Sequence, residues 1–383
     1  MAYIPRTKVK KPKRNNWLWY TVGAVGFVVI SGLLYHVFSV DIDPIEYQLT
    51  EVKEVPLSAT QNNGLSEIEQ ISISPHSGAE SIVYVNGTIY TGTEDWKILR
   101  IRDSKVEVFH DLLESNYSSN GACGRPLGMR LSRNVDRILF VGSSCGIFSL
   151  SLESGAVKKI FVPDSRLKSR AFDDLDILPS GNIITSEFSL KYSLDELNKE
   201  LFEARPNGRL ILANPKTGMW KVLADGLHFP NGVQLHPDGK SVLLVESTRA
   251  RVLRVPLGEN GPVTVFVDGL PGYPDNIRTS PRGGFWIPVS NVRDGSLFSL
   301  VFERMGQWPF IRRVAYRVNS LISGLELTKT KSSMLLRVDE QGQTVEVWHD
   351  PHNRVFNVAE VCEADGHLFT SSYFLPYVGK IRL

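Results

Sequence analysis

The chain repeats one local pattern, a short hairpin-like unit, from residue 65 to its end. Such units occupy 82–91, 127–142, 175–185, 233–245, 277–289 and 359–370. Repetition at roughly 45 residues, with about four short strands per unit, is the sequence signature of a β-propeller. The pattern therefore predicts an all-β fold, a six-bladed β-propeller over residues 65–383.

The unit at 229–248 is the clearest example. Val233 and Leu235 alternate with polar neighbours, as in a half-buried strand. Pro237-Asp-Gly then supplies the residues of a tight turn, and 242–245 is an apolar run typical of a strand covered on both faces. Asn231 lies just ahead of the first strand. Similar turns recur at Pro179-Ser-Gly, Pro281-Arg-Gly-Gly and Ala364-Asp-Gly.

The spacing of the units identifies two insertions. Residues at the unit starts (Glu80, Pro126, Asp173, Asn231 and Asp275) are separated by 46, 47, 58 and 44 residues. The longest of these gaps holds a helix-like insertion at 193–204. The next gap, 85 residues to Glu360, holds an insertion at 297–325 that is rich in Phe, Trp and Arg. We expect the second insertion to form a capping helix; the alternative is a contact with membrane or protein.

The last unit, 358–383, has room for three strands only. Residues 65–72 are available to supply the missing outer strand and close the ring. Closure of this kind removes exposed sheet edges. Residues 41–64 have no clear period and are expected to form a stalk or a wrapping segment.

Charge is distributed unevenly along the chain. Six of the 43 basic residues and none of the 41 acidic ones lie in the first 40 residues, so the remainder is acidic by about four charges. A mildly acidic body argues against nucleic acid as a partner.

Residues 17–40 contain no Lys, Arg, Asp or Glu. A helix of this length crosses a hydrocarbon core of ~30 Å. The sequence therefore predicts a basic cytosolic tail (1–16) and a transmembrane signal anchor (17–40). By the positive-inside rule this is a type II membrane protein of the plasma membrane or endoplasmic reticulum, its propeller in the lumen or outside the cell. The alternative is a cleaved signal peptide, but the apolar run is long and no small-residue cleavage site follows it.

That topology places the body in an oxidising compartment, where disulfides persist. Cys123 and Cys145 are each eleven residues from a predicted turn at Asn134, so they fall nearly opposite one another and are expected to form a disulfide. Cys362 is left as a small buried residue in a strand. Asn86 and Asn116 begin glycosylation sequons, which also occur by chance.

The innermost strand of each blade begins at one end of the central channel, so residues there converge from distant parts of the chain. Four of these strand-start residues have side chains that can offer an oxygen ligand: Glu80, Asp173, Asn231 and Asp275. Asp174 and Asn276 are adjacent and are of the same kind. Such a ring suits Ca²⁺, which takes six to eight oxygen ligands, and does not suit zinc. The competing interpretation is that each residue caps a turn through local hydrogen bonds.

Four segments resemble the strictosidine synthase-like propellers: Cys-Gly-Arg-Pro-Leu-Gly-Met-Arg (123–130), Phe-Pro-Asn-Gly-Val-Gln-Leu (229–235), Gly-Tyr-Pro-Asp-Asn-Ile-Arg (272–278) and Ala-Glu-Val-Cys-Glu-Ala-Asp-Gly-His-Leu (359–368). The resemblance extends over nearly all of the chain after the predicted anchor. The wider superfamily includes paraoxonases, gluconolactonases and regucalcin-like proteins. It implies a six-bladed propeller and, for many members, Ca²⁺-dependent hydrolysis of esters or lactones.

The resemblance carries over unevenly from residue to residue. Glu80, Asn231 and Asp275 match metal ligands of the calcium-dependent relatives, whereas Asp173 stands where relatives usually have Asn. Leu127 stands where paraoxonases have a histidine proposed as general base. Glu360 matches the catalytic glutamate of plant strictosidine synthases.

The resulting prediction is a membrane-anchored, Ca²⁺-dependent hydrolase of arylesterase or lactonase type acting on small esters. Its predicted catalytic residues are Asp275, as nucleophile or water-orienting group, and Glu360, as acid/base. The predicted metal ligands are Glu80, Asp173, Asn231, Asp275 and Asn276. The rivals are a non-catalytic binding propeller with a structural calcium, which gives the same ligands, and a condensing enzyme of the strictosidine synthase type.

Overall fold

The structure is a computed structural model that describes residues 17–56, 58–114, 123–258, 261–322, 332–350 and 352–383. The chain divides into two compact units, Met1–Ile42 and Asp43–Leu383. Each is described by itself. The predicted basic tail, 1–16, and the sequon at Asn116 lie outside the described residues.

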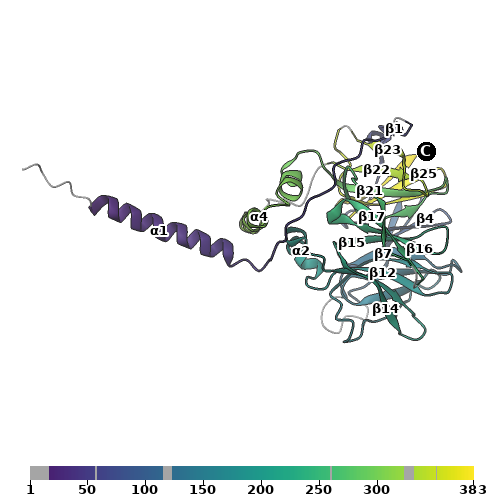
Figure 1. Cartoon of the computed structure of the whole chain (residues 1–383). Helices are drawn as coiled ribbons and strands as arrows, with labels where there is room; N and C mark the ends of the chain where they lie inside the picture. Colours follow the sequence, from purple (N-terminus) through teal and green to yellow (C-terminus); the bar gives the residue numbers. More distant parts are fainter. Residues whose placement is uncertain (1–16, 57, 115–122, 259–260, 323–331, 351) are drawn as a thin grey trace, which may run out of the picture. The chain divides into compact units, whose positions relative to one another are not determined.

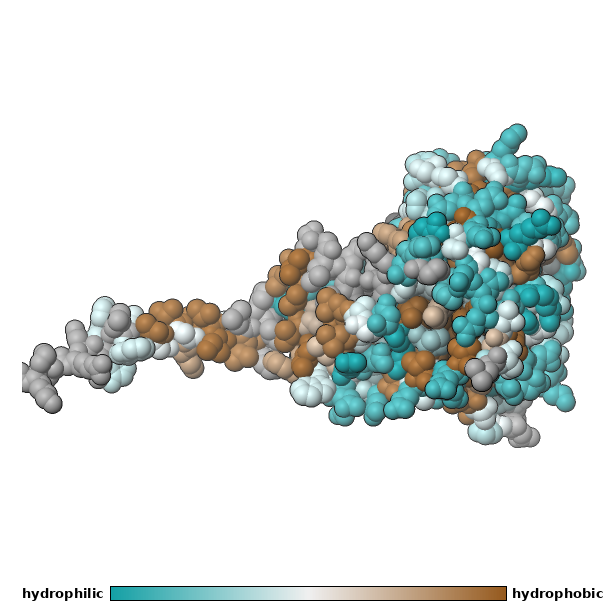
Figure 2. All heavy atoms as spheres, turned by 90° about the horizontal axis from the view of Figure 1, so that it is seen from above, coloured by the Kyte–Doolittle hydropathy of each residue, from teal (hydrophilic) through white to brown (hydrophobic). Residues whose placement is uncertain are grey.

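The first unit contains the helix expected within 17–40, as α1 (Trp17–Phe38). Among the described residues, however, no helix is long and apolar enough to cross a membrane. The transmembrane span predicted at 17–40 is therefore not found among the described residues. Large apolar side chains of α1 are exposed, among them Trp17, Phe27 and Tyr35, and Figure 2 shows hydrophobic (brown) residues along part of the helix.

In the second unit the described residues form six sheets, which confirms the predicted six-bladed β-propeller (Figure 1). The first blade is β3 (Ile82–Val85), β4 (Thr88–Gly92), β5 (Lys97–Arg102) and β6 (Lys105–Asp111). The second is β7 (Pro126–Leu131), β8 (Arg137–Gly142), β9 (Gly146–Ser151) and β10 (Val157–Phe161). The third is β11 (Ala171–Ile177), β12 (Ile183–Ser189), β13 (Gly208–Ala213) and β14 (Trp220–Leu227).

The remaining blades use the same antiparallel order. The fourth is β15 (Pro230–Leu235), β16 (Ser241–Glu246), β17 (Arg251–Pro256) and β18 (Thr264–Val267). The fifth is β19 (Gly272–Pro274), β20 (Arg278–Thr279), β21 (Phe285–Val292), β22 (Met334–Val338) and β23 (Thr344–His349). The sixth is β24 (Val358–Ala364), β25 (His367–Ser372) and β26 (Tyr377–Arg382).

Two segments from before the first blade complete the last two sheets. β2 (Glu69–Ser72) pairs with β26, with Glu69 opposite Lys380, which confirms the predicted closure of the ring. β1 (Thr60–Asn62) pairs in parallel with β23 and was not expected. The chain before it lies along the propeller, where Tyr47 N donates to Gly306 O (3.1 Å) and Lys53 N to Gly269 O (2.9 Å). Residues from 43 onward thus wrap the propeller.

Both predicted insertions contain helices. The first forms η2 (Leu194–Glu196) and α2 (Leu197–Glu203); the second forms α3 (Leu297–Ser299), η4 (Leu300–Arg304) and α4 (Pro309–Leu321). Short 3-10 turns, η1 (Gly64–Glu67) and η3 (Ser247–Arg249), complete the elements. α2 and α4 lie side by side (Figure 1), and the buried Arg312 of α4 donates through Nε to Phe202 O at 3.0 Å. The insertion therefore caps the α2 end of the propeller, as expected.

Candidate metal and catalytic site

The inner strands of four blades interrupt their pairing at the same place. In the second, third, fourth and sixth blades the ladder skips two residues near the strand start: Leu127-Gly128, Asp173-Asp174, Asn231-Gly232 and Ala359-Glu360. Such bulges re-aim side chains and are common beside functional sites. In the other blades the corresponding pairs are Glu80-Ser81, directly before β3, and Asp275-Asn276, between β19 and β20.

These pairs define two layers across the centre of the propeller. The first layer holds the first member of each pair: Glu80, Leu127, Asp173, Asn231, Asp275 and Ala359. The second layer holds Ser81, Gly128, Asp174, Gly232, Asn276 and Glu360. The repeat spacing places Pro126 and Glu360 at the unit starts, in line with Glu80 and Asp275. Both positions are wrong by one residue, since Leu127 and Ala359 occupy the first layer. A one-residue slip moves a side chain to a different face of its strand.

The first layer concentrates negative charge in a buried place. Glu80, Asp173 and Asp275 are each less than a tenth exposed. Burial, followed by the neighbouring carboxylates Asp173 and Asp275, raises the pKa of Glu80 well above its usual value. Burial and Asp275 do the same to the pKa of Asp173. Burial also raises the pKa of Asp275 to about 7, against a hydrogen bond from Asn231 that lowers it.

Several oxygens at this level have no partner. Among the described residues, Glu80 Oε2, Asn231 Oδ1 and Asn276 Oδ1 are buried without a hydrogen bond. Asn276, from the second layer, donates through Nδ2 to Glu80 Oε1 at 2.8 Å and so holds that carboxylate. Unpaired buried oxygens cost free energy, and hard cations satisfy them. The donor set, all oxygen and short of positive charge, thus fits a calcium ion.

The acidic side chains of the first layer are not arranged as a ready metal site. In the part of the chain that the structure describes, no group of three or more His, Cys, Asp or Glu side chains is placed to hold a metal ion. The predicted ligands Glu80, Asp173, Asn231 and Asp275 do share the first layer. Asn276 lies one layer below and contacts Glu80.

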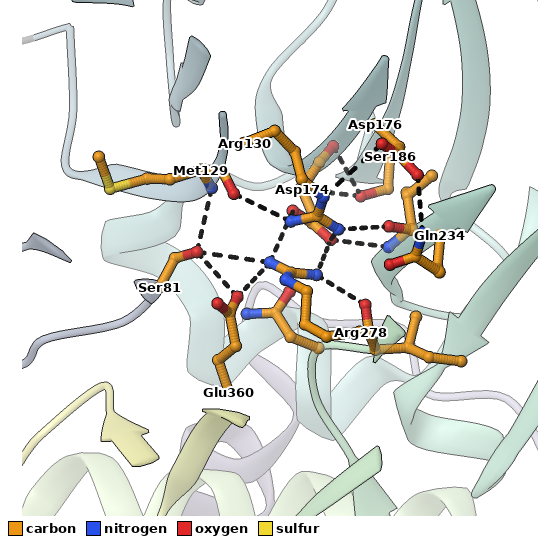
Figure 3. A network of polar contacts seen from close by, with 12 residues as sticks. Ser81, Met129, Arg130, Asp174, Asp176, Ser186, Gln234, Arg278 and Glu360 are labelled. Atoms are coloured by element: carbon orange, nitrogen blue, oxygen red, sulfur yellow. Dashed lines mark hydrogen bonds and ion pairs between the residues drawn. The ribbon is translucent and has the colours of Figure 1, made fainter. Parts of the chain in front are cut away.

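The second layer is closed by ion pairs (Figure 3). Asp174 accepts from Arg130 (Nη2 to Oδ2, 3.2 Å), from Arg278 (Nη1 to Oδ2, 2.8 Å) and from Val233 N (2.8 Å). Arg278 also pairs with Glu360, which accepts from Ser81 Oγ at 2.8 Å and from Ile82 N at 2.9 Å. Burial raises the pKa of Asp174, but the two arginines outweigh it and leave the pKa lowered. Asp176 also pairs with Arg130, so three acidic and two basic side chains offset one another in this network.

Small residues make this packing possible. A Cβ on Gly128 would lie 2.1 Å from Asp174 Oδ1, and one on Gly232 would lie 2.5 Å from the backbone N of Ile277. Both glycines are second-layer residues. The strands thus approach closely enough for the arginines to reach across the channel from neighbouring blades.

The structure separates the two predicted catalytic residues. Asp275 lies in the first layer with a raised pKa. Glu360 lies in the second layer, and both of its oxygens have partners.

Sequence reasoning missed Arg130 and Arg278, although each stands two residues after a second-layer position, where a strand returns its side chains to the same face.

Other sequence predictions have mixed outcomes. Cys123 and Cys145 form the expected disulfide, and Cys362 is a free, half-buried residue of β24. Asn86 is exposed at the turn between β3 and β4, so its sequon is accessible. Whether it carries sugar stays a prediction.

Comparison with known proteins is consistent with this geometry. The family description "Strictosidine synthase" matches residues 173–259, and "Strictosidine synthase-like, N-terminal" matches residues 59–101. The adipocyte plasma membrane-associated protein of Salmo salar is 32% identical over 355 residues, which are 89% of this chain and 84% of that protein. The chain belongs to the strictosidine synthase-like family.

Solved structures show the same fold at lower sequence identity. A calcium-binding protein, regucalcin, from Agrobacterium tumefaciens has 15% identity and a TM-score of 0.55, covering 84% of this chain and 94% of its own. A gluconolactonase from Xanthomonas campestris has 14% identity and a TM-score of 0.55, covering 90% and 98%. At such identity the likeness shows the propeller fold alone.

Proposed function

We propose that this protein is a calcium-dependent hydrolase of small esters, of arylesterase or lactonase type. The observation that carries the proposal is the first layer, where burial and then neighbouring carboxylates raise the pKa of Glu80 and of Asp173, and where buried oxygens lack partners among the described residues. A divalent cation relieves both costs at once, because it offsets the like charges and satisfies the free oxygens.

Four residues would hold the ion: Glu80, Asp173, Asn231 and Asp275. Asn276 is assigned to orient Glu80, since it donates to Oε1 and leaves Oε2 open. A calcium ion bound there would polarise an ester carbonyl as a Lewis acid.

Asp275 is the proposed proton acceptor or nucleophile. Without an ion, burial raises the pKa of Asp275 to about 7; a bound calcium ion would hold the carboxylate ionised, which is the form that a base or nucleophile requires. Burial also keeps bulk water from this carboxylate and strengthens its electrostatic interactions.

Glu360 is assigned a positioning role in place of the predicted acid/base role. Its carboxylate is paired with Arg278 and bonded to Ser81 and Ile82 N, so proton transfer would first have to break those contacts. Ser81 adjoins Glu80, and Glu360 thereby fixes the backbone that carries a proposed ligand.

A second candidate is a binding propeller with a structural calcium. The observation that favours it is the apolar, buried Leu127 in the first layer, at the position where a catalytic base would be expected. This candidate requires the same four ligands and no turnover.

We also propose that the chain is membrane-associated, as the name of its relative, adipocyte plasma membrane-associated protein, says of that protein, with the propeller in an oxidising compartment. The disulfide and the exposed apolar side chains of α1 support this proposal. Fractionation of cells, with glycosidase treatment of wild type and Asn86→Gln, tests it. A cytosolic protein without sugar would contradict it.

The enzymatic proposal is tested on the full chain, purified in detergent, with phenyl acetate and a lactone as substrates. We expect a chelator to abolish hydrolysis, added calcium to restore it, and Asp275→Ala to lower kcat about 10²-fold or more. Asp136→Ala, an exposed hairpin change, is the matched control. Hydrolysis indifferent to the chelator would refute the proposal, and calcium binding without turnover would establish the structural alternative.

A further inference from the structure

Arg125 differs from the other arginines at the centre of the propeller. Its Nη2 donates to two backbone carbonyls, Gly78 O and Tyr373 O, the latter at 3.0 Å. Within the described residues its Nε is buried without a partner, and it makes no ion pair with a carboxylate. Arg130 and Arg278 each pair with Asp174. The direct hydrogen bonds of Arg125 thus go to neutral groups, while the carboxylates that attract it, Glu80 and Glu94 foremost, make no ion pair with it among the described residues.

The backbone around Arg125 is built to hold it in place. The disulfide Cys123–Cys145 ties its strand to the neighbouring loop, and Ser143 N donates to Arg125 O at 3.1 Å. Gly124 has φ +76°, and a Cβ there would lie 2.1 Å from Ser143 Oγ. A Cβ on Gly78 would lie 2.7 Å from the guanidinium itself. These constraints orient the side chain toward the first layer.

Arg125 lies near the carboxylates of the first layer but forms no ion pair with them. Gly78 is two residues before Glu80. Burial lowers the pKa of Arg125, and the attraction of Glu80 offsets part of that lowering. Glu80, Asp173 and Asp275 would carry three negative charges against this single positive one. Glu94 also attracts Arg125, so the guanidinium has negative neighbours but, among the described residues, direct hydrogen bonds only to backbone carbonyls.

Tyr373, whose carbonyl receives Arg125, offers a second donor. Its hydroxyl oxygen accepts from Asn357 Nδ2 at 2.6 Å and from Asn291 Nδ2 at 3.4 Å. With two amide donors on the oxygen, the hydroxyl hydrogen is left to donate, and no acceptor for it is found among the described residues. Burial raises the pKa of Tyr373, so the hydroxyl stays protonated.

We propose that Arg125 and the Tyr373 hydroxyl form an anion subsite beside the first layer, and that it takes a carboxylate group of the substrate or product. A guanidinium and a phenol supply directional donors that suit a planar monoanion. A dianion such as phosphate would be repelled more strongly by the nearby carboxylates. The substrates favoured by this subsite are acid-bearing esters, or lactones whose product is a hydroxy acid.

The inference rests on the proposed hydrolysis for its substrate class, so two measurements separate them. The first compares kcat/KM for 4-acetoxybenzoate, an anionic ester, with that for the neutral phenyl acetate. In Arg125→Gln we expect the ratio of the two to fall about tenfold, as for the loss of one charged hydrogen bond. Arg133→Gln, an exposed arginine that donates to Ile177 O, should leave the ratio unchanged.

The second measurement needs no turnover: titration of benzoate into the full-length protein by calorimetry, with calcium present. We expect Arg125→Gln and Tyr373→Phe each to weaken binding, the former about tenfold. Tyr373→Phe retains the charge of Arg125 and the ring packing, so it still tests the subsite if the arginine variant fails to fold.

The outcomes are distinct. Benzoate binding that depends on Arg125, in a protein that hydrolyses no ester, would support the subsite and refute the hydrolase. Hydrolysis with equal benzoate affinity in wild type and both variants would refute the subsite and leave the hydrolase standing. A variant that changes calcium affinity alone would show that Arg125 merely offsets the carboxylates.

Discussion

The two layers at the centre of the propeller contain similar residue types in opposite electrostatic conditions. In the second layer Asp174 and Glu360 face Arg130 and Arg278, and each carboxylate has several donors. In the first layer three carboxylates face one another, and Glu80 Oε2 and Asn231 Oδ1 have no partner among the described residues.

Asp173 and Asp174 make the contrast sharpest, because they are neighbours in one bulge of β11. The pKa of Asp173 is raised, first by burial and then by Asp275, whereas that of Asp174 is lowered by two arginines that outweigh its burial. A self-neutralised layer stabilises the fold, and an uncompensated one indicates a ligand.

The largest expected effect is that of Asp174→Asn. The substitution leaves Arg130 and Arg278 buried without their shared counter-ion, and breaking a buried pair costs about 3–5 kcal/mol. Chemical denaturation of the full chain measures the loss. Asp136→Asn, in an exposed pair with Arg137, serves as the control. A variant as stable as wild type would mean that the second layer does not hold the propeller together.

The pH dependence of stability should report on the first layer. Asp275 has an ordinary pKa of 3.8 and a folded value of about 7, and Glu80 and Asp173 shift in the same direction. The folded state therefore binds more protons than the unfolded state above pH about 4, so stability falls as the pH rises toward and through 7.

With a chelator present we expect the thermal midpoint to drop by several degrees between pH 5 and pH 8. Calcium should remove much of the drop, because it replaces the protons. Asp275→Asn should flatten the curve recorded in chelator. A midpoint that rises over this interval in wild type, and equally in the variant, would contradict the electrostatic account of the first layer.

The smallest expected effect has the opposite sign to the first. Asp173→Asn removes one of three like charges, so at pH 8 in chelator it should stabilise the protein by about 1 kcal/mol. The same variant should respond less to calcium, since one charged ligand is lost. Denaturation midpoints with and without calcium measure both effects. If Asp173→Asn and Asp174→Asn destabilise alike, the two layers are electrostatically equivalent.

Much of the fold could be predicted from the sequence. A sequence repeat predicts propeller blades, because each hairpin unit can bury its apolar face only against the neighbouring units. The closing strand β2, the insertions containing α2 and α4, and the Cys123–Cys145 disulfide follow from local spacing. Among the described residues no helix fits the predicted membrane span, and the parallel pairing of β1 with β23 has no repeat signature in the sequence.

The site was only partly predictable, because charge alone does not tell which layer a residue joins. Glu360 looked equivalent to Asp275, yet the bulge in β24 puts Ala359 in the first layer and Glu360 in the second. Arg125 was visible within a motif but not as a group near the carboxylates. Its position depends on contacts with Gly78 and Tyr373, 47 and 248 residues away.

The sequence by itself determined the repeat, the blade count and the supply of oxygen donors at the starts of the inner strands. Periodicity and turn chemistry act over a few residues and are legible along the chain. Only the tertiary structure decided which carboxylates are paired and which are left to repel one another. Those energies depend on burial and on distances between blades, and a single bulged residue redistributes them.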